Sequence, residues 1–308
     1  VVRIAAGKGR LDAIDGARAL GLVRVYYGHF VEQVMYLENP AAAVQYKWIY
    51  SFHMILFFVL SGWVRGARPT LPGVREFVTS TLAARIVPYV FFSVVLGILS
   101  LFFSGWFPLV DLSTANGYFQ AFISTVLGFP LLNIPLWFVA CLVSVECLHR
   151  LLHGLLDTTP RILVAALVCY TAGYALNERF FFFGQGRSFW LLHEVPVVYA
   201  FYLVGVVLGR NRAQTLVSTG GAMALLLLAL GCVQLTFDLN QGPFRYLQAV
   251  IILLSGHGHF LWFPFTALAG SILVLALGRV LQRVAPLAFL GRNALILLGM
   301  NGVFYHFI

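Results

Sequence analysis

The stretch WIYSFHMILFFVLSGWV, residues 48–64, is the clearest indication of the fold class. It contains no Lys, Arg, Asp or Glu, and most of its side chains are aliphatic or aromatic. A helix that crosses the hydrocarbon core of a membrane needs about 20 consecutive, mainly apolar residues. We therefore predict a membrane-spanning helix at 47–66.

The rest of the chain has the same character. Of its 308 residues, 60% are hydrophobic and only 10% are charged, and the mean hydropathy is +0.89. Because soluble globular proteins carry about 25% charged residues, this composition excludes a soluble enzyme, a disordered chain and a disulfide-stapled secreted domain. We expect one transmembrane domain over residues 1–308 and no soluble domain.

Further apolar runs predict an all-α, polytopic bundle in the membrane. The run at 244–256 is ambiguous, so the pattern gives nine or ten spans, and the stretch 105–133 is interpreted as an interfacial segment. The final run, 294–308, covers roughly 22 Å as a helix, less than the ~30 Å hydrocarbon core. Since the chain also begins at Val1 rather than Met, we expect one or both ends to be missing. The predicted spans are 14–36, 47–66, 82–104, 134–153, 161–177, 190–209, 216–236, 260–281 and 289–308.

The distribution of basic residues predicts a cytoplasmic N-terminus, because Lys and Arg are enriched in cytoplasmic loops. In this orientation eleven basic residues lie on the inner side of the first six spans or in the N-terminal tail, against four on the outer side up to residue 259. Beyond that point Arg279, Arg283 and Arg292 lie outside if 244–256 spans, and inside if it is re-entrant. The net charge of +9 includes no run of Lys and Arg, so we expect no nucleic-acid partner.

The first predicted span contains an aligned Arg and His. Ionisable side chains inside a membrane are costly and usually face a partner or a wet cavity. Arg18 and His29 are 11 residues apart, which places them on one helix face and roughly 16 Å apart along the axis. Asp15 is expected to pair with Arg18. His53 in the second span lies at a depth similar to His29, so we expect the two imidazoles to share a cavity.

Other residues allow two interpretations each. Arg65 and Arg85 either bind phosphate, whose oxygens fit the paired N–H groups of a planar guanidinium group, or belong to an ordinary positively charged cytoplasmic loop. Trp137 is either an aromatic-belt residue or a platform for a sugar ring. Glu146 is either a functional carboxylate or the partner of a nearby Arg.

Two polar pairs lie near the predicted outer ends of helices. The pair His193-Glu194 lies either where an acceptor sugar would enter or in an ordinary polar interface. His257 and His259 have a spacing that a metal ion can use, but no acidic or Cys neighbour in the sequence completes a ligand set. We therefore expect no metal site.

Several of these residues fall in motifs of one protein family. The stretch RLDAIDGARALGLVRVYYGHF (10–30) resembles the first helix of the acyltransferase 3 family of membrane acyltransferases, whose Arg-x10-His motif is matched by Arg18 and His29. The stretch 48–64 resembles the family's second helix. RIVPYVFF (85–92), PLWFV (135–139) and GRNALILLGMNGVFYHF (291–307) are similar to its third helix, its Leu-Trp-Phe segment and its final helix. The resemblance is specific over 10–64 and 85–92 and weak between 150 and 285.

The chain departs from the family pattern at three positions. Ile55 replaces a usual Pro, Ala294 replaces a frequent Ser, and Leu82 stands where many members carry the first Arg of a pair completed here by Arg85. The second helix is similar to those of the fucose 4-O-acetylase-like and exopolysaccharide O-acetyltransferase branch. Members usually have about ten spans. No fused extracytoplasmic domain follows, so this chain would complete transfer alone or deliver the acyl group to a separate protein.

The resemblance implies an O-acyltransferase of the bacterial inner membrane. It would move an acyl group, acetyl or succinyl, from cytoplasmic acyl-CoA, usually acetyl-CoA, to a sugar hydroxyl of an extracytoplasmic or lipid-linked glycan. Arg18, Arg85 and Arg65 would hold the coenzyme A phosphates. Other expected partners are the glycan acceptor, membrane lipids and a polysaccharide synthesis or export protein.

The resemblance leaves the roles of the two histidines open. His29 would act as a general base or as a transient acyl carrier. His53 would orient His29, bind the acceptor or stabilise the oxyanion.

Two other classes of protein remain open. A transporter or lipid-linked glycan flippase also has intramembrane charges around a central cavity, although no inverted repeat is evident in the hydropathy. A structural subunit of a polysaccharide synthesis complex is disfavoured by the alignment of Arg18 with His29.

Overall fold

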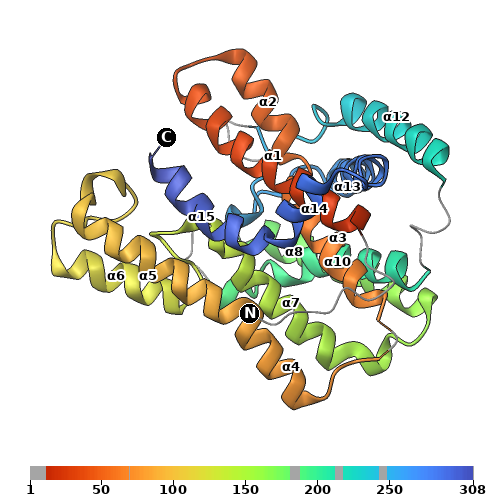
Figure 1. Ribbon diagram of the computed structural model, residues 1–308, viewed down its shortest axis with the longest axis horizontal. Coiled ribbons are helices and arrows are strands. Elements are labelled where there is room, and N and C mark those ends of the chain that lie inside the picture. Colours follow the sequence, from red (N-terminus) through yellow and green to blue (C-terminus); the bar gives the residue numbers. More distant parts are fainter. Residues whose placement is uncertain (1–11, 69, 181–187, 212–217, 243–247, 308) are drawn as a thin grey trace.

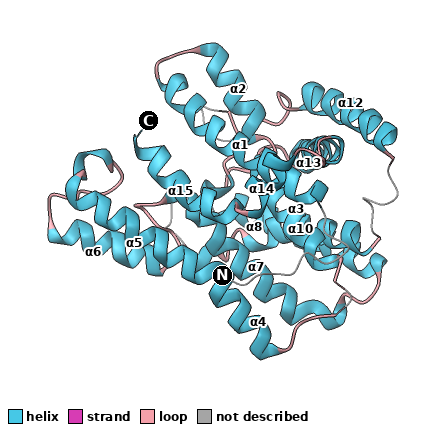
Figure 2. Ribbon diagram, in the orientation of Figure 1, coloured by secondary structure: helices cyan, strands magenta, loops and turns pink. Residues whose placement is uncertain are grey.

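The computed structural model describes residues 12–68, 70–180, 188–211, 218–242 and 248–307. Over these residues the structure is all-helical with connecting loops, as Figure 2 shows, and it contains one isolated bridge between Ile251 and Gly256. This confirms the predicted fold class. The α-helices are α1 (Asp12–Tyr36), α2 (Pro40–Tyr50), α3 (His53–Gly66), α4 (Val74–Thr81), α5 (Val87–Phe102), α6 (Ala115–Val126), α7 (Trp137–Leu152), α8 (Thr159–Phe180), α10 (Val195–Arg210), α12 (Thr219–Thr236), α13 (Trp262–Val280), α14 (Ala285–Arg292) and α15 (Ala294–Phe307).

Short helical turns complete the described architecture. They are the π turn η1 (Leu82–Ile86) and the 3₁₀ turns η2 (Ser104–Trp106), η3 (Ile134–Leu136), η4 (His153–Leu155), η5 (Phe189–Leu191) and η6 (Ile252–Leu254).

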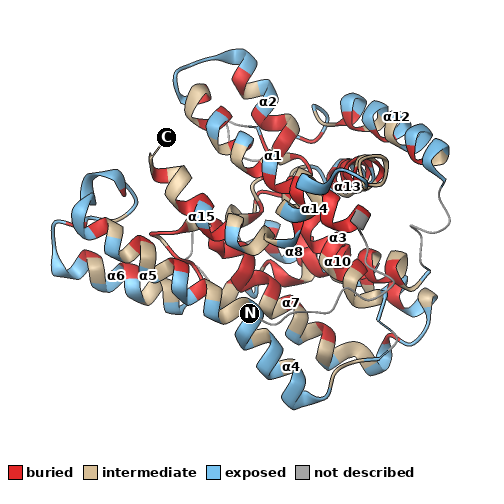
Figure 3. Cartoon of the chain, viewed as in Figure 1, coloured by how far each residue is buried: buried red, intermediate tan, exposed pale blue. Residues whose placement is uncertain are grey.

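The centre of the bundle is the contact between α3 and α10, in the region where buried residues concentrate (Figure 3). Glycines on both helices make this contact close. Gly62 and Gly66 of α3 face the backbone of α10, and Gly205 and Gly209 of α10 face that of α3. A Cβ atom at Gly62 would lie only 1.9 Å from the carbonyl oxygen of Tyr202. Small residues four apart allow such close approach between helices in membranes.

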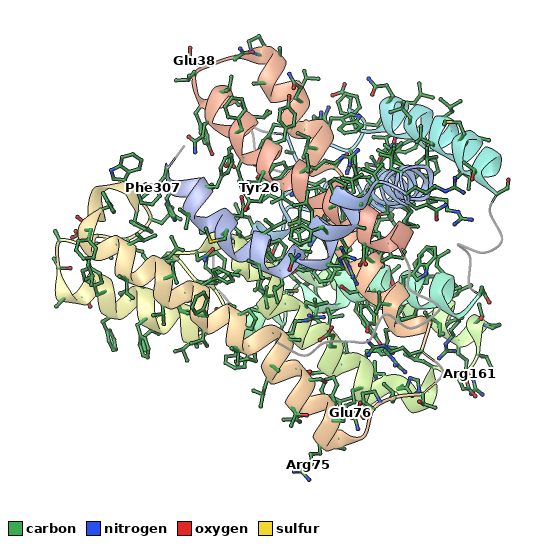
Figure 4. All side chains as sticks on the ribbon, in the orientation of Figure 1. Tyr26, Glu38, Arg75, Glu76, Arg161 and Phe307 are labelled. Atoms are coloured by element: carbon green, nitrogen blue, oxygen red, sulfur yellow. The ribbon has the colours of Figure 1, made fainter. Side chains whose placement is uncertain are left out.

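α1 packs against α13 and α14 and also contacts α15 (Figure 1). Gly291 of α14 lies so close to α1 that a Cβ atom there would be 1.8 Å from the carbonyl oxygen of Asp15. Tyr26, which Figure 4 labels between α1 and α15, donates its hydroxyl to the carbonyl of Leu297 at 2.6 Å. These contacts bring the end of α14 and the start of α15 beside α1.

α4, η1 and α5 form one continuous helix over Val74–Phe102, which begins earlier than the predicted span at 82–104. The π turn has a local cause. Pro88 has no N–H group, so the carbonyl of Ala84 lacks its usual helical donor. The N–H of Val87 bonds back to the carbonyl of Leu82, and the guanidinium group of Arg85 donates to the Ala84 carbonyl at 3.3 Å. The π turn therefore fixes where Arg85 leaves the helix.

α6 is the helix within the stretch 105–133, which the sequence indicates as an interfacial segment. It runs antiparallel to α5, and the two helices lie side by side in Figure 1. The Tyr118 hydroxyl donates to the carbonyl of Ser100 at 3.2 Å, and the Tyr89 hydroxyl donates to that of Thr125 at 2.7 Å. The sequence lacked a hydropathy signal for this helix, because α6 is short and mixes polar with aromatic residues.

Apolar side chains cover much of the outer surface of α5, α8 and α12, and Figure 3 shows exposed residues along α5 and α12. Phe91, Ile98, Leu167 and Leu228 are examples, each more than half exposed. Large contiguous apolar surfaces are rare on soluble monomers and are expected where a protein contacts lipid. The chain is therefore an integral membrane protein.

The predicted total of about ten spans is not confirmed. α1 is long enough at 25 residues but is rich in charged residues, and α10 has only 16 residues. α14 and α15 are bent by 78° and add a seventh candidate if they form one span. Within the described ranges, six segments are long and apolar enough to cross a membrane: Pro40–Gly66, Val74–Phe102, Ile134–Leu155, Thr159–Arg179, Thr219–Thr236 and Trp262–Val280.

The ambiguous run at 244–256 does not form a spanning helix where it is described. From residue 248 onward it contains only the turn η6 and the bridge between Ile251 and Gly256. Its first residues lie outside the described ranges. So do Arg3, Lys8 and Arg10, the N-terminal basic residues that support the predicted orientation.

Candidate active site

A break between α2 and α3 places His53 at the start of a helix. The apolar segment Pro40–Gly66 is interrupted at Ser51 and Phe52, and His53 is the first residue of α3. Its Nδ1 atom lies 3.1 Å from the carbonyl oxygen of Ile49. Because a carbonyl only accepts hydrogen bonds, Nδ1 carries the proton in this contact. In the neutral ring the Nε2 atom is then left as an acceptor.

Glu32 on α1 gathers three hydrogen-bond donors. Nδ1 of His29 lies 3.2 Å from Oε2, and the Tyr50 hydroxyl donates to the same oxygen at 3.3 Å. The Tyr36 hydroxyl donates to Oε1 at 3.2 Å. An ionised carboxylate accepts only, so the shared proton belongs to Nδ1 of His29. In the neutral imidazole, Nε2 of His29 is therefore free to accept a proton.

His29 and His53 line the same cavity, as expected from the sequence; we call it the histidine cavity. Its volume of about 340 Å³ is typical of a small-molecule site. The His29 ring meets the Tyr305 ring edge-on at 5.0 Å, and the His53 ring lies 4.4 Å from that of Tyr50. Four tyrosines and a tryptophan line it together with the histidines: Tyr36, Tyr46, Tyr50, Tyr305 and Trp137.

Arg18 and Arg85 line a second cavity of about 200 Å³, which we call the arginine cavity. Arg292, at the end of α14, adds a third guanidinium group. Arg18 pairs with Asp15 at 3.1 Å, as the sequence predicts, and Arg85 pairs with Glu146 of α7 at 3.0 Å. Glu146 is therefore the partner of a nearby Arg. These three cations and two anions leave a net positive charge beside the arginine cavity.

The histidine cavity and the arginine cavity meet at two side chains. Met54, which follows His53 directly, and Leu298 of α15 line both cavities. A Met side chain is unbranched and flexible. The wall between the two cavities therefore includes one flexible side chain.

The family model described as an acyltransferase domain, acyltransferase 3, matches residues 11–308. The chain belongs to the acyltransferase 3 family. Comparisons with curated proteins and with solved structures gave no match. Family membership confirms the resemblance in the motifs at 10–30 and 48–64, although it does not confirm the fucose 4-O-acetylase-like branch. Together with the apolar periphery, it makes this chain a membrane acyltransferase.

In this acyltransferase Arg65 does not join Arg18 and Arg85. It lies near the C-terminal end of α3 and lines a third cavity with Arg68 and Arg210. Sequence reasoning grouped the three candidate phosphate ligands because all were assigned to one side of the membrane. In the structure Arg65 lies away from Arg18 and Arg85. Ser61 of α3 lines the arginine cavity, but Arg65, one turn later on the same helix, lines the third cavity instead.

Trp137 lies in the core and not in an aromatic belt. It begins α7, is only 7% exposed, and lines the histidine cavity. The interfacial alternative is therefore wrong, because η3 starts α7 inside the bundle. A contact between Trp137 and a sugar ring stays a prediction.

His193 and Glu194 form a network that does not reach the histidine cavity in the described structure. Glu194 is fully buried and accepts hydrogen bonds from the Ser255 hydroxyl at 2.6 Å and from Nε2 of His257 at 2.7 Å. His193 lies 3.4 Å from the same carboxylate and contacts the Ser188 hydroxyl. This network holds the loop that follows residues 250–254, and those residues form one wall of the histidine cavity.

Sequence reasoning missed two members of the site. Glu32 follows His29 by three residues, the same spacing as in the Asp15–Arg18 pair, so a signal for its contact with His29 was present. Arg292 was recognised only as a loop charge. Its position beside Arg18 depends on the packing of α14 against α1, which has no local sequence signal.

Proposed function

We propose that this membrane acyltransferase transfers an acyl group, acetyl in the simplest case, from acyl-CoA to a hydroxyl group of a glycan. The observation that carries the proposal is the meeting of two chemically different cavities at Met54 and Leu298. One is cationic and suits a phosphorylated donor. The other is lined by imidazole and aromatic groups and suits a hydroxyl-bearing acceptor. A thioester placed between the Met54 and Leu298 side chains would face both cavities.

The arginine cavity suits the donor because guanidinium groups bind phosphate oxygens through paired hydrogen bonds. Arg18 lies roughly 16 Å from His29 along α1. Coenzyme A carries its phosphates and its thioester at opposite ends of a long pantetheine arm, so a cationic site set back from the reactive His fits this molecule. Arg18 and Arg85 are the proposed phosphate ligands.

The histidine cavity suits a sugar because its aromatic side chains offer flat apolar surfaces. Trp137, Tyr46 and Tyr305 can stack on the C–H faces of a sugar ring, and Nε2 of His53 can accept a hydrogen bond from a sugar hydroxyl. Since Nδ1 of His53 is committed to the Ile49 carbonyl, neutral His53 has no donor for an oxyanion. We therefore assign His53 to acceptor binding.

His29 is the proposed general base. Its Nε2 takes the proton of the acceptor hydroxyl while the hydroxyl oxygen attacks the thioester carbonyl. The tetrahedral intermediate collapses as the C–S bond breaks, and the imidazolium returns the proton to the thiolate sulfur. The products are an ester and coenzyme A. Glu32 holds the proton on Nδ1 and stabilises the imidazolium, the role of the carboxylate in a catalytic triad.

The alternative course has His29 carry the acyl group. Nε2 would then attack the thioester itself, and the sugar hydroxyl would attack the resulting acyl-imidazole. Rapid quenching of the protein with labelled acetyl-CoA and no glycan distinguishes the courses, because only the second leaves label on His29.

The proposed orientation follows from the predicted cytoplasmic N-terminus. Arg18 is nearer than His29 to the N-terminal end of α1, so the arginine cavity faces the cytoplasm and the histidine cavity lies towards the opposite side. Cytoplasmic acyl-CoA would then acylate an extracytoplasmic or lipid-linked glycan of a bacterial cell envelope.

The test is incubation of the purified protein with radiolabelled acetyl-CoA and a panel of glycans. We expect label in the glycan fraction, and we expect acetyl-CoA to raise the thermal unfolding midpoint of the protein. A flippase would show neither effect. The proposed function would be refuted if the protein bound the glycan but transferred no label to it and was not stabilised by acetyl-CoA.

A further inference from the structure

A third cavity, of about 460 Å³, lies where α3, α7 and α10 end near one another. Its wall is polar and basic, and we call it the basic cavity. It shares no lining residue with the histidine cavity or the arginine cavity. Its cationic and imidazole side chains are Arg65, Arg68, Arg210, His149 and His153.

Two glycines in the wall of the basic cavity mark a close contact between α3 and α10. Gly66 and Gly209 bring the ends of α3 and α10 together, and a Cβ atom at either glycine would lie 2.1 Å from a backbone oxygen of the opposing helix. The basic cavity lies beside this close contact, and Arg65, Arg68 and Arg210 line it.

Backbone carbonyls, and not carboxylates, hold two of the guanidinium groups. Arg210 donates to the carbonyls of Leu156 and Asp157 at 2.7 and 2.9 Å, and Arg65 donates to that of Thr70 at 3.0 Å. A carbonyl orients a guanidinium group without cancelling its charge. Since each guanidinium group has five N–H donors, several remain for a ligand.

The acidic side chain in the wall already has a partner. Asp157 accepts two hydrogen bonds from Arg161, at 2.7 and 2.8 Å, and these hold the pKa of the Asp157 carboxyl below its usual range. Among the residues that the structure describes, no carboxylate forms an ion pair with Arg65, Arg68 or Arg210. The residues outside the described ranges include no Asp or Glu. The basic cavity therefore keeps its positive charge.

We propose that the basic cavity is a phosphate-binding site, with Arg65, Arg68 and Arg210 as its ligands. A terminal phosphate or a diphosphate carries more negative charge and more acceptor oxygens than a carboxylate, and guanidinium forks bind such oxygens in pairs, which suits three cations around one cavity. The phosphate can belong to the nucleotide end of a molecule such as coenzyme A or to the head group of an anionic membrane lipid. The site stands on its own geometry and does not depend on the proposed acyl transfer.

The test measures binding of inorganic pyrophosphate to the purified full-length protein in neutral detergent by calorimetry. The variant is the double substitution Arg65→Gln and Arg68→Gln, which leaves the carbonyl contacts of Arg210 in place. The matched control is Arg75→Gln, because Arg75 is exposed on α4 and projects away from the molecule in Figure 4.

We expect pyrophosphate to bind the wild-type protein and the Arg75→Gln control equally. Loss of two charge-assisted contacts should weaken binding to the double variant by at least about tenfold. Equal binding by the double variant and the wild type would overturn the proposal, because the pyrophosphate would then occupy the arginine cavity. No binding to the wild type at millimolar concentration would overturn it as well.

Competition experiments identify the source of the phosphate. Displacement of pyrophosphate by coenzyme A, and more weakly by coenzyme A lacking its 3′-phosphate, assigns the site to the nucleotide. Displacement only in nanodiscs that contain phosphatidylglycerol, and not in phosphatidylcholine alone, assigns it to a lipid head group. A His29→Ala protein should bind pyrophosphate normally, so this proposal and the proposed function fail independently.

Discussion

Replacement of Glu32 by Gln tests whether this carboxylate fixes the proton on the His29 ring. The two side chains have the same shape, and a Gln carbonyl oxygen in place of Oε1 can still accept a hydrogen bond from the Tyr36 hydroxyl. The amide nitrogen, however, can donate to Nδ1 of His29, which stabilises the tautomer that carries its proton on Nε2. That tautomer cannot accept a proton from the acceptor hydroxyl.

The expected effect follows from the contacts of Glu32. The His29–Glu32 contact, at 3.2 Å, is a hydrogen bond to a charged group, which contributes about 1.5–3 kcal/mol. Since about 1.4 kcal/mol corresponds to tenfold in rate, Glu32→Gln should lower the turnover number by roughly 10- to 100-fold. The KM for acetyl-CoA should change little, because Glu32 does not line the arginine cavity.

The assay is transfer of radiolabel from acetyl-CoA to the glycan, with the amount of folded protein measured in the same membranes. Tyr36→Phe is the matched control, since it removes one hydrogen bond to Glu32 and leaves the His29 contact in place. Its turnover number should fall only by a few-fold. Turnover by Glu32→Gln within about twofold of the wild type would refute the assignment of His29 as a base oriented by Glu32.

Three further substitutions test other parts of the structure. Met54→Trp should block the junction of the two cavities and lower turnover by about 100-fold, because small displacements of reacting groups are costly. Acetyl-CoA should still stabilise this variant against heat. Normal turnover would show that the reaction does not take place at the junction. Gly62→Ala should destabilise the protein by about 1–3 kcal/mol through overpacking against α10. Thermal unfolding measures this effect, and Gly97→Ala, at a glycine with no neighbour within 4 Å, should be neutral or stabilising. Arg85→Gln should raise the KM for acetyl-CoA by about tenfold or more, whereas Arg75→Gln should leave it unchanged. If titration with acetyl-CoA gave the same KM for both variants, Arg85 would be excluded as a residue that binds acetyl-CoA.

The sequence was sufficient for the parts of the site that depend on one helix. The alignment of Arg18 with His29 and the pairing of Arg18 with Asp15 follow from helical periodicity alone. The depth of His53 followed from the position of two adjacent apolar runs. The motifs at 10–30 and 48–64 led to the family, since they combine residue type with spacing.

Features that depend on packing between distant helices had no such signal. The separation of Arg65 from Arg85 depends on where α3, α7 and α10 converge. The buried position of Trp137 depends on α7 starting inside the bundle. The span count stayed open near residue 250, because composition does not distinguish an apolar loop within the protein from an apolar helix in lipid.

The His29→Ala variant tests whether His29 performs the proposed acyl transfer chemistry. Wild-type and variant proteins are purified, shown to unfold at the same temperature, and given radiolabelled acetyl-CoA with the glycan that the wild type acylates. Loss of a general base predicts a fall in transfer of about 100- to 10,000-fold, with stabilisation by acetyl-CoA retained. Transfer at nearly the wild-type rate by the folded variant would contradict the assignment of His29 as the general base.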